Sequence, residues 1–465
     1  MNPERKKILL LNPPGEKLYV RDYYCSKVSK ANYLYHPADL LFQSGFFARR
    51  HDVRVIDAVA LGLKPRGCID EILRFRPDAV LFLTGSISWR EDRAFLAELK
   101  RLLPGALLLG SGDVLLEKGA ERLEKNPFID AIALDFTTED PFRFVEGDRS
   151  NVPTMVCRAD GGIVDASFSR PRGAEFEIPV PRFELFPSGR YHFPFVRRRP
   201  FATVLTDYGC PFRCTFCVMA SLGYKWRTVE NVLLELDRLK EMNVRDVYFH
   251  DQTFGANRTR TAALLEKMIE RNYGFDFVCW SRVDVAAAEM LSLLKRAGCH
   301  TIMMGVESGS DETLKNTNKG ATVRDVRRTF ELAKNNGLRT VATYIIGLPG
   351  ESPGDCLNTI KLALELDTDF ASFNIPVPRM STGLRKTAIE KRWIGEDMDV
   401  MDQSGTFPAM GTGNLSSGEI MRWRRRAHRA FYGRPSYILR RLLRVGTLYE
   451  LRSLVSMGMV VLFGK

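Results

Sequence analysis

The chain has 465 residues, enough for two to four domains of roughly 100–200 residues each. Hydrophobic residues make up 45% and charged residues 27% of the sequence, which excludes a disordered chain. The net charge of +12 comes mostly from residues 419–465, which contain ten Arg and one Lys but only two Glu. This stretch therefore carries +9, and residues 1–418 carry only +3. This distribution does not indicate a nucleic-acid-binding body, but it does indicate a basic C-terminal tail.

The first third of the chain alternates strand-like and helix-like segments. Strands that alternate with helices form parallel sheets, so residues 1–148 are predicted to be a Rossmann-like domain. Residues 149–196 contain many prolines and little periodicity, and we expect them to be a connector. The predicted strands are 7–14, 52–58, 78–86, 106–113 and 128–134, and the predicted helices are 37–50, 69–75 and 91–103.

A second alternating series begins near residue 201 and predicts a partial (β/α)6 TIM-type barrel over residues 197–385. Residues 386–465 remain as a C-terminal region with a basic amphipathic helix. The fold class is therefore α/β. The predicted barrel strands are 201–206, 246–251, 275–282, 300–308, 339–347 and 370–376, and the helices between them are 229–242, 258–271, 286–297, 323–335 and 355–366.

Residues that could bind a ligand or take part in a reaction follow each of the first five barrel strands. Barrel enzymes carry their chemistry at the carboxyl ends of the strands, so this placement indicates a functional site. The residues, in strand order, are Cys210, Cys214 and Cys217, then Asp251 and Gln252, then Arg282, then Glu307 and Ser308, and finally Gly347 and Gly350.

The three clustered cysteines stand in the sequence GCPFRCTFC, with the spacing C-x3-C-x2-C. A tight cysteine cluster in a chain without a disulfide framework indicates metal binding. Three thiolates bind three irons of a four-iron cluster and leave the fourth iron open. The alternative is a zinc or purely structural site, but zinc would need a fourth ligand, and no suitably spaced Cys or His follows Cys217.

The cysteine loop resembles that of the radical S-adenosylmethionine (SAM) enzymes. The resemblance implies a [4Fe-4S] cluster held by Cys210, Cys214 and Cys217, with SAM on the open iron. It also implies that SAM is cleaved to a 5′-deoxyadenosyl radical, and that an electron donor of flavodoxin or ferredoxin type supplies the electron. The resemblance continues through the barrel, in YFHDQTF (248–254), GVESGSDETLKNTNKG (305–320) and YIIGLPGES (344–352).

The resemblance assigns cofactor contacts to the strand-end residues. Asp251 and Gln252 are expected near the amino group of SAM, Glu307 and Ser308 at its ribose or methionine end, and Gly347 and Gly350 under the adenine. Arg282, at the end of the third strand, is also expected at the cofactor site. Each has a plainer alternative, since glycines often serve turns and Asp251 could be an ordinary polar strand end. The sequence identifies no catalytic residue.

A sheet domain before such a barrel resembles the cobalamin-dependent radical SAM enzymes, in the branch of the anaerobic magnesium-protoporphyrin monomethyl ester cyclase and hopanoid-tailoring enzymes. Cobalamin would then lie at the strand ends that carry Thr84, Gly85, Gly110 and Gly112, because ligands bind beyond the carboxyl ends of such strands. The chain has no D-x-H-x-x-G motif for a histidine under the cobalt. The alternative is a sheet domain kept for packing or substrate shape.

The basic tail reads EIMRWRRRAHRAFYGRPSYILRRLLRV over residues 419–445. Ile438, Leu439, Leu442 and Leu443 share one helical face, and Pro435 suits a helix start. Such a helix could lie on an anionic membrane, or it could close the barrel with its Arg face in water. We expect a cytoplasmic protein, with contact at the inner membrane surface under the first alternative.

Together these features predict a radical SAM enzyme of methyltransferase or oxidative cyclase type, with cobalamin. It would methylate, cyclise or rearrange a hydrophobic substrate such as a lipid, isoprenoid or tetrapyrrole. One alternative is a cobalamin-free radical SAM tailoring enzyme. Another is a tRNA methylthiotransferase, but those enzymes carry a second set of three cysteines, whereas Cys25, Cys68 and Cys157 lie far apart and no nucleic-acid module is evident.

Overall fold

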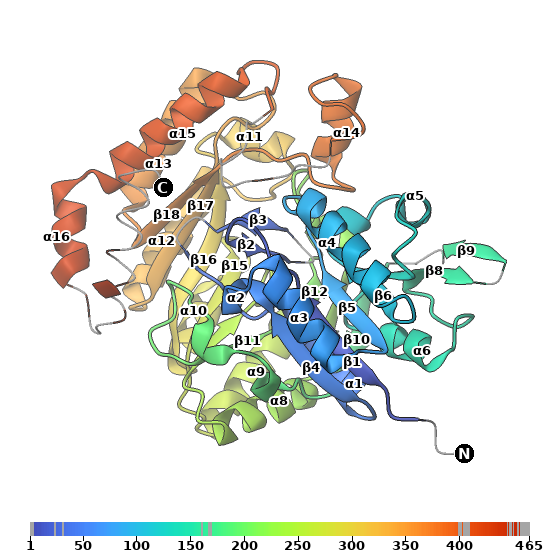
Figure 1. The fold of residues 1–465 in the computed structure, drawn as a ribbon. Helices are drawn as coiled ribbons and strands as arrows, with labels where there is room; N and C mark the ends of the chain where they lie inside the picture. The colour runs from blue at the N-terminus through green and yellow to red at the C-terminus, as the bar shows by residue number, and fades with distance from the viewer. Residues whose placement is uncertain are drawn as a thin grey trace.

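The computed structural model describes residues 4–22, 25–29, 32–159, 161–165, 170–398, 402, 410–443, 445, 449, 451–452 and 455. Two sheet-based parts lie against each other, and the last two helices of the chain pack on the outer side of the second part (Figure 1). The predicted α/β class, with a Rossmann-like sheet followed by a partial barrel, is confirmed.

The N-terminal part is a seven-stranded sheet in the order β4-β1-β5-β6-β7-β8-β9. Its central strands are apolar on both faces, as parallel strands covered by helices are. The strands are β1 Lys7–Asn12, β4 Asp52–Asp57, β5 Ala79–Leu83, β6 Leu107–Ser111, β7 Ala131–Ala133, β8 Met155–Ala159 and β9 Gly162–Asp165. The helices are α1 Ala38–Ala48, α2 Ala58–Leu61, α3 Pro65–Phe75, α4 Trp89–Leu102, α5 Gly119–Lys125 and α6 Asp140–Glu146.

Two strands of this sheet lie where the sequence predicted an irregular connector. β8 pairs antiparallel with β7, and β9 pairs antiparallel with β8, so only the first five strands of the order are parallel. β8 is short and β9 is mostly exposed, so neither produces a clear apolar pattern. The difference arises because sheet pairing stabilises segments whose local sequence carries little strand signal.

The second part is a six-stranded parallel sheet in the order β11-β14-β15-β16-β17-β18. In the described residues β18 has no pairing with β11, so the barrel is open. The strands are β11 Phe201–Val204, β14 Asp246–Phe249, β15 Asp276–Arg282, β16 Cys299–Glu307, β17 Arg339–Ile345 and β18 Phe370–Asn374. The helices are α8 Val229–Glu241, α9 Arg258–Glu270, α10 Ala288–Arg296, α11 Asp311–Asn316, α12 Val323–Asn335 and α13 Pro353–Leu366.

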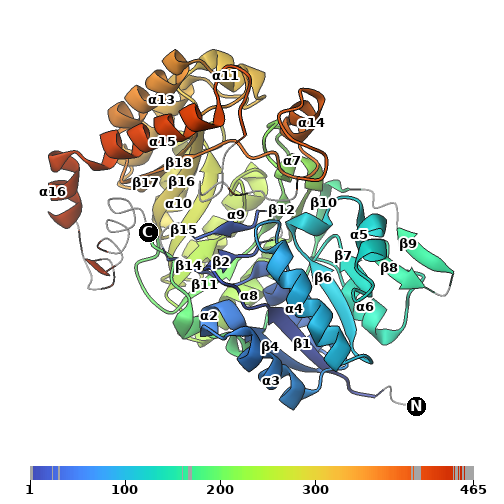
Figure 2. The same ribbon diagram turned by 45° about the horizontal axis from the view of Figure 1, so that its top comes forward.

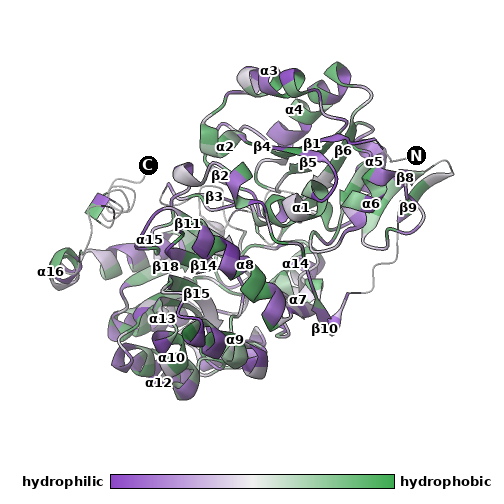
Figure 3. Ribbon diagram, turned by 90° about the horizontal axis from the view of Figure 1, so that it is seen from below, coloured by the Kyte–Doolittle hydropathy of each residue, from purple (hydrophilic) through white to green (hydrophobic). Residues whose placement is uncertain are grey.

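The helices of the second part are amphipathic and turn their polar sides outward (Figure 3). α12 shows how the local sequence defines such a helix. Thr322 and Asp325 form a reciprocal capping box at its start, and its buried residues recur at helical spacing through Val323, Val326 and Phe330.

Shorter elements join the two parts. The strands are the hairpin pair β2 Tyr19–Val20 and β3 Lys27–Val28, and a three-stranded sheet of β10 Arg172–Phe176, β13 Tyr224–Arg227 and β12 Asp207–Gly209. The helices are α7 Met219–Leu222 and the 3₁₀ turns Asp113–Leu115, Phe183–Leu185 and Ser188–Arg190. One continuous hydrophobic core contains residues of both sheets, so the two parts pack as a unit.

The C-terminal region adds α14 Gly383–Glu390, α15 Ser417–Tyr432 and α16 Pro435–Leu443. α15 packs on α13 and β18, and α16 continues from it along the outer edge of the molecule (Figures 1 and 2). The helix predicted to begin at Pro435 therefore forms. Among the described residues, no helix has both the length and the apolar character needed to cross a membrane.

Candidate functional site

The cysteine loop joins β12 to α7 at the carboxyl end of the barrel sheet. Gly209, at the start of the loop, has φ +73, and a Cβ there would overlap the carbonyl oxygen of Gly223. The close approach lets Cys210 N donate to Gly223 O over 3.0 Å. Cys217 N donates to Cys214 O over 3.1 Å, which closes a turn between two of the cysteines. The loop shape therefore depends on a glycine at position 209.

The three thiols lie in one electrostatic environment. Burial, followed by the charges of Cys210 and Cys214, raises the pKa of Cys217 to about 12, and burial also raises the pKa of Cys210. Neighbouring thiols become thiolates together only when a cationic group neutralises them. Among the described residues no three Cys, His, Asp or Glu side chains surround the position of a single metal ion. Independently of this, three cysteines in one short loop are the donors that an iron–sulfur cluster uses.

Arg282, at the end of β15, connects the cysteine loop to the neighbouring strand. Its Nη1 donates to Cys214 Sγ over 3.2 Å, and its guanidinium lies 3.8 Å from the ring centroid of Phe212 in the same loop. Asp284 accepts from Nε and Nη2, each over 2.9 Å, and the carbonyl of Lys319 accepts from Nη2. The sequence predicted Arg282 at the cofactor site, and the structure places its side chain on a cluster cysteine.

Glu307 and Lys319 form a buried ion pair beside this arginine, with 2.8 Å between Oε1 and Nζ. Glu307 has φ +68, a left-handed backbone conformation that residues other than glycine rarely adopt. Its carboxylate lies over Gly305, where a Cβ would overlap Oε1. The pair therefore occupies space that only a glycine at position 305 leaves open.

Ser308 and Gly347 contact a third residue, Glu351. Ser308 Oγ donates to Glu351 Oε1 over 2.7 Å, and the amides of Gly347 and Leu348 donate to Oε2 over 2.8 and 3.1 Å. Burial raises the pKa of Glu351 to about 7, against the lowering effect of these hydrogen bonds. The carboxylate thus shapes the turn after β17, and the side chain of Ser308 is engaged with it.

The predicted turn glycines differ in their surroundings. Gly347 has φ +91, and a Cβ there would meet Ile420 of α15 at 2.5 Å. Gly350 has φ +87 and faces open space. Both positions favour glycine for their backbone, but only Gly347 also lies close under another element.

Asp251 is fully buried and holds the backbone at the exit of β11. Its Oδ1 accepts from Thr206 N over 2.6 Å and from Asp207 N over 2.5 Å, and Thr206 Oγ1 donates to Oδ2 over 3.1 Å. Burial raises the pKa of Asp251 to about 7. Gln252, the next residue, keeps a partly exposed side chain. Asp251 therefore positions the segment that leads into the cysteine loop.

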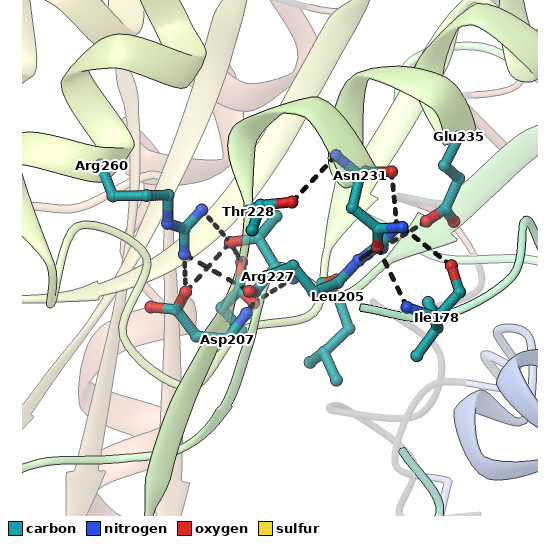
Figure 4. Close-up of polar contacts among 10 residues, drawn as sticks. Ile178, Leu205, Asp207, Arg227, Thr228, Asn231, Glu235 and Arg260 are labelled. Carbon is teal, nitrogen blue, oxygen red and sulfur yellow. Dashed lines mark hydrogen bonds and ion pairs between the residues drawn. The ribbon is translucent and has the colours of Figure 1, made fainter. Parts of the chain in front are cut away.

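A buried network continues from this segment (Figure 4). Arg260 pairs with Asp207 and donates to Thr206 Oγ1 over 2.9 Å. On the other side, Arg227 donates to Leu205 O over 3.0 Å and pairs with Glu235. These contacts hold both sides of the β11 exit rigidly, which is what a site needs if its ligands must be held in a fixed geometry.

Thr343 and Ser372, which the sequence did not indicate, lie in a row with Arg282 that crosses the sheet next to the cysteine loop. Arg282 pairs with Gly305, Gly305 with Thr343, and Thr343 with Ser372, so the four lie at one level on one face. Gly305, Thr343 and Ser372 are partly exposed, as are Ile345 and Asn374 one step further. The opposite face is closed, because Tyr344 stacks on Phe373, which contacts Phe431 of α15.

The partly exposed side chains of this row lie on β17 and β18, beside the Glu307–Lys319 pair that covers Gly305. Their small polar groups suit the amino, carboxylate and ribose groups of SAM. The residues present therefore fit SAM. The contacts predicted for Asp251 and Ser308 stay predictions, and in this structure their side chains bind the backbone at Thr206 and Asp207 and the carboxylate of Glu351.

The predicted cobalamin residues lie at the carboxyl ends of β5 and β6, where they pack against the chain itself. A Cβ on Gly85 would overlap Ser26, one on Gly110 would meet Leu115 and Phe82, and one on Gly112 would overlap the carbonyl of Thr84. Thr84 Oγ1 donates to Asp92 Oδ2 over 2.8 Å. These residues pack against the chain and form no open cradle, and their contact with the corrinoid stays a prediction.

Between the two parts lies a polar contact with aromatic surroundings. Asp22 Oδ2 lies 3.1 Å from His250 Nε2 and accepts from Tyr35 OH over 2.9 Å. His250 Nδ1 lies 2.9 Å from Tyr248 OH, which also accepts from Trp280 Nε1 over 3.0 Å. The contact joins the β2–β3 segment to the carboxyl ends of β14 and β15. Tyr33 and Trp280 remain partly exposed beside it.

Comparison with known proteins agrees with this geometry. Residues 204–363 match the radical SAM superfamily, a span that includes the cysteine loop and the row on β15–β17. The uncharacterized methyltransferase PH0819 of Pyrococcus horikoshii is 28% identical over 93% of this chain and 94% of its own length. The anaerobic magnesium-protoporphyrin IX monomethyl ester cyclase of Rubrivivax gelatinosus is 25% identical over 80% of this chain and 68% of its own.

The fold is similar to that of a solved structure over most of its length. The radical S-adenosylmethionine methyltransferase TsrM from Kitasatospora setae, solved with cobalamin and a [4Fe-4S] cluster, superposes with a TM-score of 0.66. The superposition covers 83% of this chain and 78% of that one at 19% identity. It therefore includes the N-terminal sheet as well as the barrel.

Proposed function

We propose that this radical SAM enzyme, identified by the superfamily match over residues 204–363, is a cobalamin-dependent methyltransferase. The observation that carries the proposal is the cysteine loop, with Arg282 on Cys214, at the start of the partly exposed row on β15–β18. When bound, the cluster supplies the electron that cleaves SAM to a carbon radical, and cobalamin supplies a transferable methyl group. The likeness of the fold to that of TsrM, over 83% of this chain, supports the methyl transfer.

The chain's own residues position and shield these groups. Cys210, Cys214 and Cys217 hold the cluster, and Arg282 directs positive charge at one of its sulfur ligands. Thr343 and Ser372 bind SAM on the partly exposed face of the sheet, while α15 closes the opposite face. The N-terminal part covers the carboxyl end of the barrel and excludes water, which a radical reaction requires.

The substrate that we propose is hydrophobic or aromatic, such as a lipid, an isoprenoid or a tetrapyrrole. Aromatic rings gather where the two parts meet, with Tyr248 at 4.4 Å from Phe193 and 5.5 Å from Tyr35 between ring centroids. Tyr33 and Trp280 are the partly exposed members of this group. Such rings pack well on a flat apolar molecule. An electron donor of flavodoxin or ferredoxin type completes the proposed system.

A second candidate function is radical cyclisation or rearrangement without cobalamin. One observation favours it: Gly85, Gly110 and Gly112 pack against Ser26, Leu115 and Thr84 instead of leaving space at the sheet edge. The reaction would then need only the cluster and SAM, both of which the barrel residues fit.

Metal and corrinoid analysis of the protein separates the two candidates. The chain is purified without oxygen from cells supplied with cobalamin, its cluster is reconstituted, and iron and corrinoid are measured per chain. About four irons with an equimolar corrinoid, followed by transfer of a deuterated methyl group from SAM to a polyprenyl, hopanoid or porphyrin substrate, supports the methyltransferase. Four irons without corrinoid favours the second candidate. A chain that binds no iron overturns both.

A further inference from the structure

Helix α16 packs with its polar side inward and its apolar side outward. Arg440 pairs with Asp367 through Nη1 and Nη2, and Arg441 Nη1 lies 3.3 Å from Asp369 Oδ1. Tyr437 OH donates to Asp369 O over 2.8 Å and is buried. The side with Tyr437, Arg440 and Arg441 is therefore the docking side. The predicted alternative of an arginine face in water is wrong for these two residues.

Four aliphatic side chains of α16 consequently face away from the protein. Ile438 is 46% exposed, Leu439 60%, Leu442 51% and Leu443 78%. Their positions fall on one helical face. Elsewhere, exposed leucines such as Leu61 and Leu234 stand alone on their helices, as is common on protein surfaces. A cluster on one face marks an interaction surface.

The helix before this surface presents positive charge. α15 exposes Arg422, Arg425, Arg426 and Arg429, whose spacing places most of them along one side. Arg426 lies 4.9 Å from the ring centroid of Trp423, which is partly exposed. Both helices lie on the edge of the molecule remote from the N-terminal sheet (Figures 1 and 2).

We propose that α15 and α16 bind the surface of an anionic lipid bilayer. Ile438, Leu439, Leu442 and Leu443 enter the boundary between headgroups and acyl chains, as the apolar face of an interfacial helix does. The exposed arginines of α15 pair with lipid phosphates, and Trp423 suits the interface because its ring is both apolar and polar. The arginines of α16 hold the helix to the protein, so the attracting charge comes from α15. This surface does not depend on the proposed reaction.

Vesicle flotation of the full-length protein tests the proposal. The vesicles are phosphatidylcholine with or without phosphatidylglycerol. The unmodified chain is expected to bind the anionic vesicles and to bind neutral ones weakly. Leu439→Ser combined with Leu443→Ser removes two of the most exposed leucines and should weaken binding by roughly tenfold or more. Leu234→Ser, at a leucine 57% exposed on α8, is the matched control and should bind like the unmodified chain.

A second pair of variants tests the charge. Arg425→Glu combined with Arg429→Glu should abolish the preference for anionic vesicles, whereas Arg101→Glu, at a side chain 71% exposed on α4, should leave it intact. Unchanged iron content shows that each variant keeps its fold and separates this result from a failure of the proposed function. The proposal is overturned if the unmodified chain ignores anionic vesicles, or if the leucine variants bind normally. It is also overturned if the leucine changes only convert a dimer to a monomer, since a second copy would then cover the face.

Discussion

The guanidinium of Arg282 donates a hydrogen bond from Nη1 to the Sγ of Cys214 over 3.2 Å. The two residues are 68 positions apart and follow different strands, yet they meet because parallel strands end at one edge of the sheet. A positive donor beside a cluster thiolate stabilises the more negative, reduced state of the cluster. Arg282 is therefore a positioning residue for the cluster as well as the start of the row toward β18.

Replacing Arg282 should lower the reduction potential of the bound cluster. Arg282→Gln removes the charge, and we expect a lower potential with a 10- to 100-fold loss of SAM cleavage, a typical effect of removing a residue that supports a metal ligand. Redox titration followed by electron paramagnetic resonance measures the potential directly. Arg258→Gln is the control, because Arg258 donates to the Asp284 carbonyl from an exposed position. An unchanged potential in Arg282→Gln would contradict the assignment.

Gly209→Ala should prevent the cysteine loop from closing. The added Cβ would overlap Gly223 O, and the backbone at φ +73 would be strained. The strain alone costs about 1–3 kcal/mol in the free energy of unfolding, and the overlap adds to it, so we also expect low iron uptake. Iron per chain and the thermal midpoint report the two effects. Gly274→Ala provides the control, since Gly274 has φ +67 but nothing within 4 Å of a Cβ. If both variants load iron equally, the close approach at Gly209 does not shape the loop.

The elements of the site follow from the sequence more fully than its contacts do. All six barrel strands and the cysteine loop were predicted, because apolar periodicity and cysteine spacing are local properties. Thr343 and Ser372 were missed, since small polar residues on strands carry no signal until the register places them beside Arg282. The orientation of α16 was also missed. It depends on Asp367 and Asp369, between α13 and β18, about 70 residues before their arginine partners.

Glu351 should make the stability of the chain depend on pH. Its pKa is about 7 in the folded chain, against 4.5 for the ordinary group. Between these values the folded chain keeps a proton that the unfolded chain has released, so stability should fall as pH rises from about 4.5 to 7. Glu351→Gln should flatten this part of the profile, measured as urea midpoints at several pH values. The pKa of Asp251 is also about 7, so the Glu351→Gln variant should still lose some stability as the pH rises. Glu98→Gln, on an exposed side chain, should keep the full slope.

The contact between Asp22 and His250 should hold the β2–β3 segment on the barrel. Asp22→Ala removes the acceptor of Tyr35 OH and the partner of His250 Nε2, and leaves buried polar groups behind, so we expect a loss of about 1–3 kcal/mol in the free energy of unfolding. Hydrogen exchange should accelerate at residues 27–28 and 248–250, on both sides of the contact. Asp78→Ala serves as the control, because Asp78 accepts from Lys7 N within the N-terminal sheet and is exposed. Exchange that accelerates only in residues 19–28 would mean that Asp22 orders its own segment without joining the two parts.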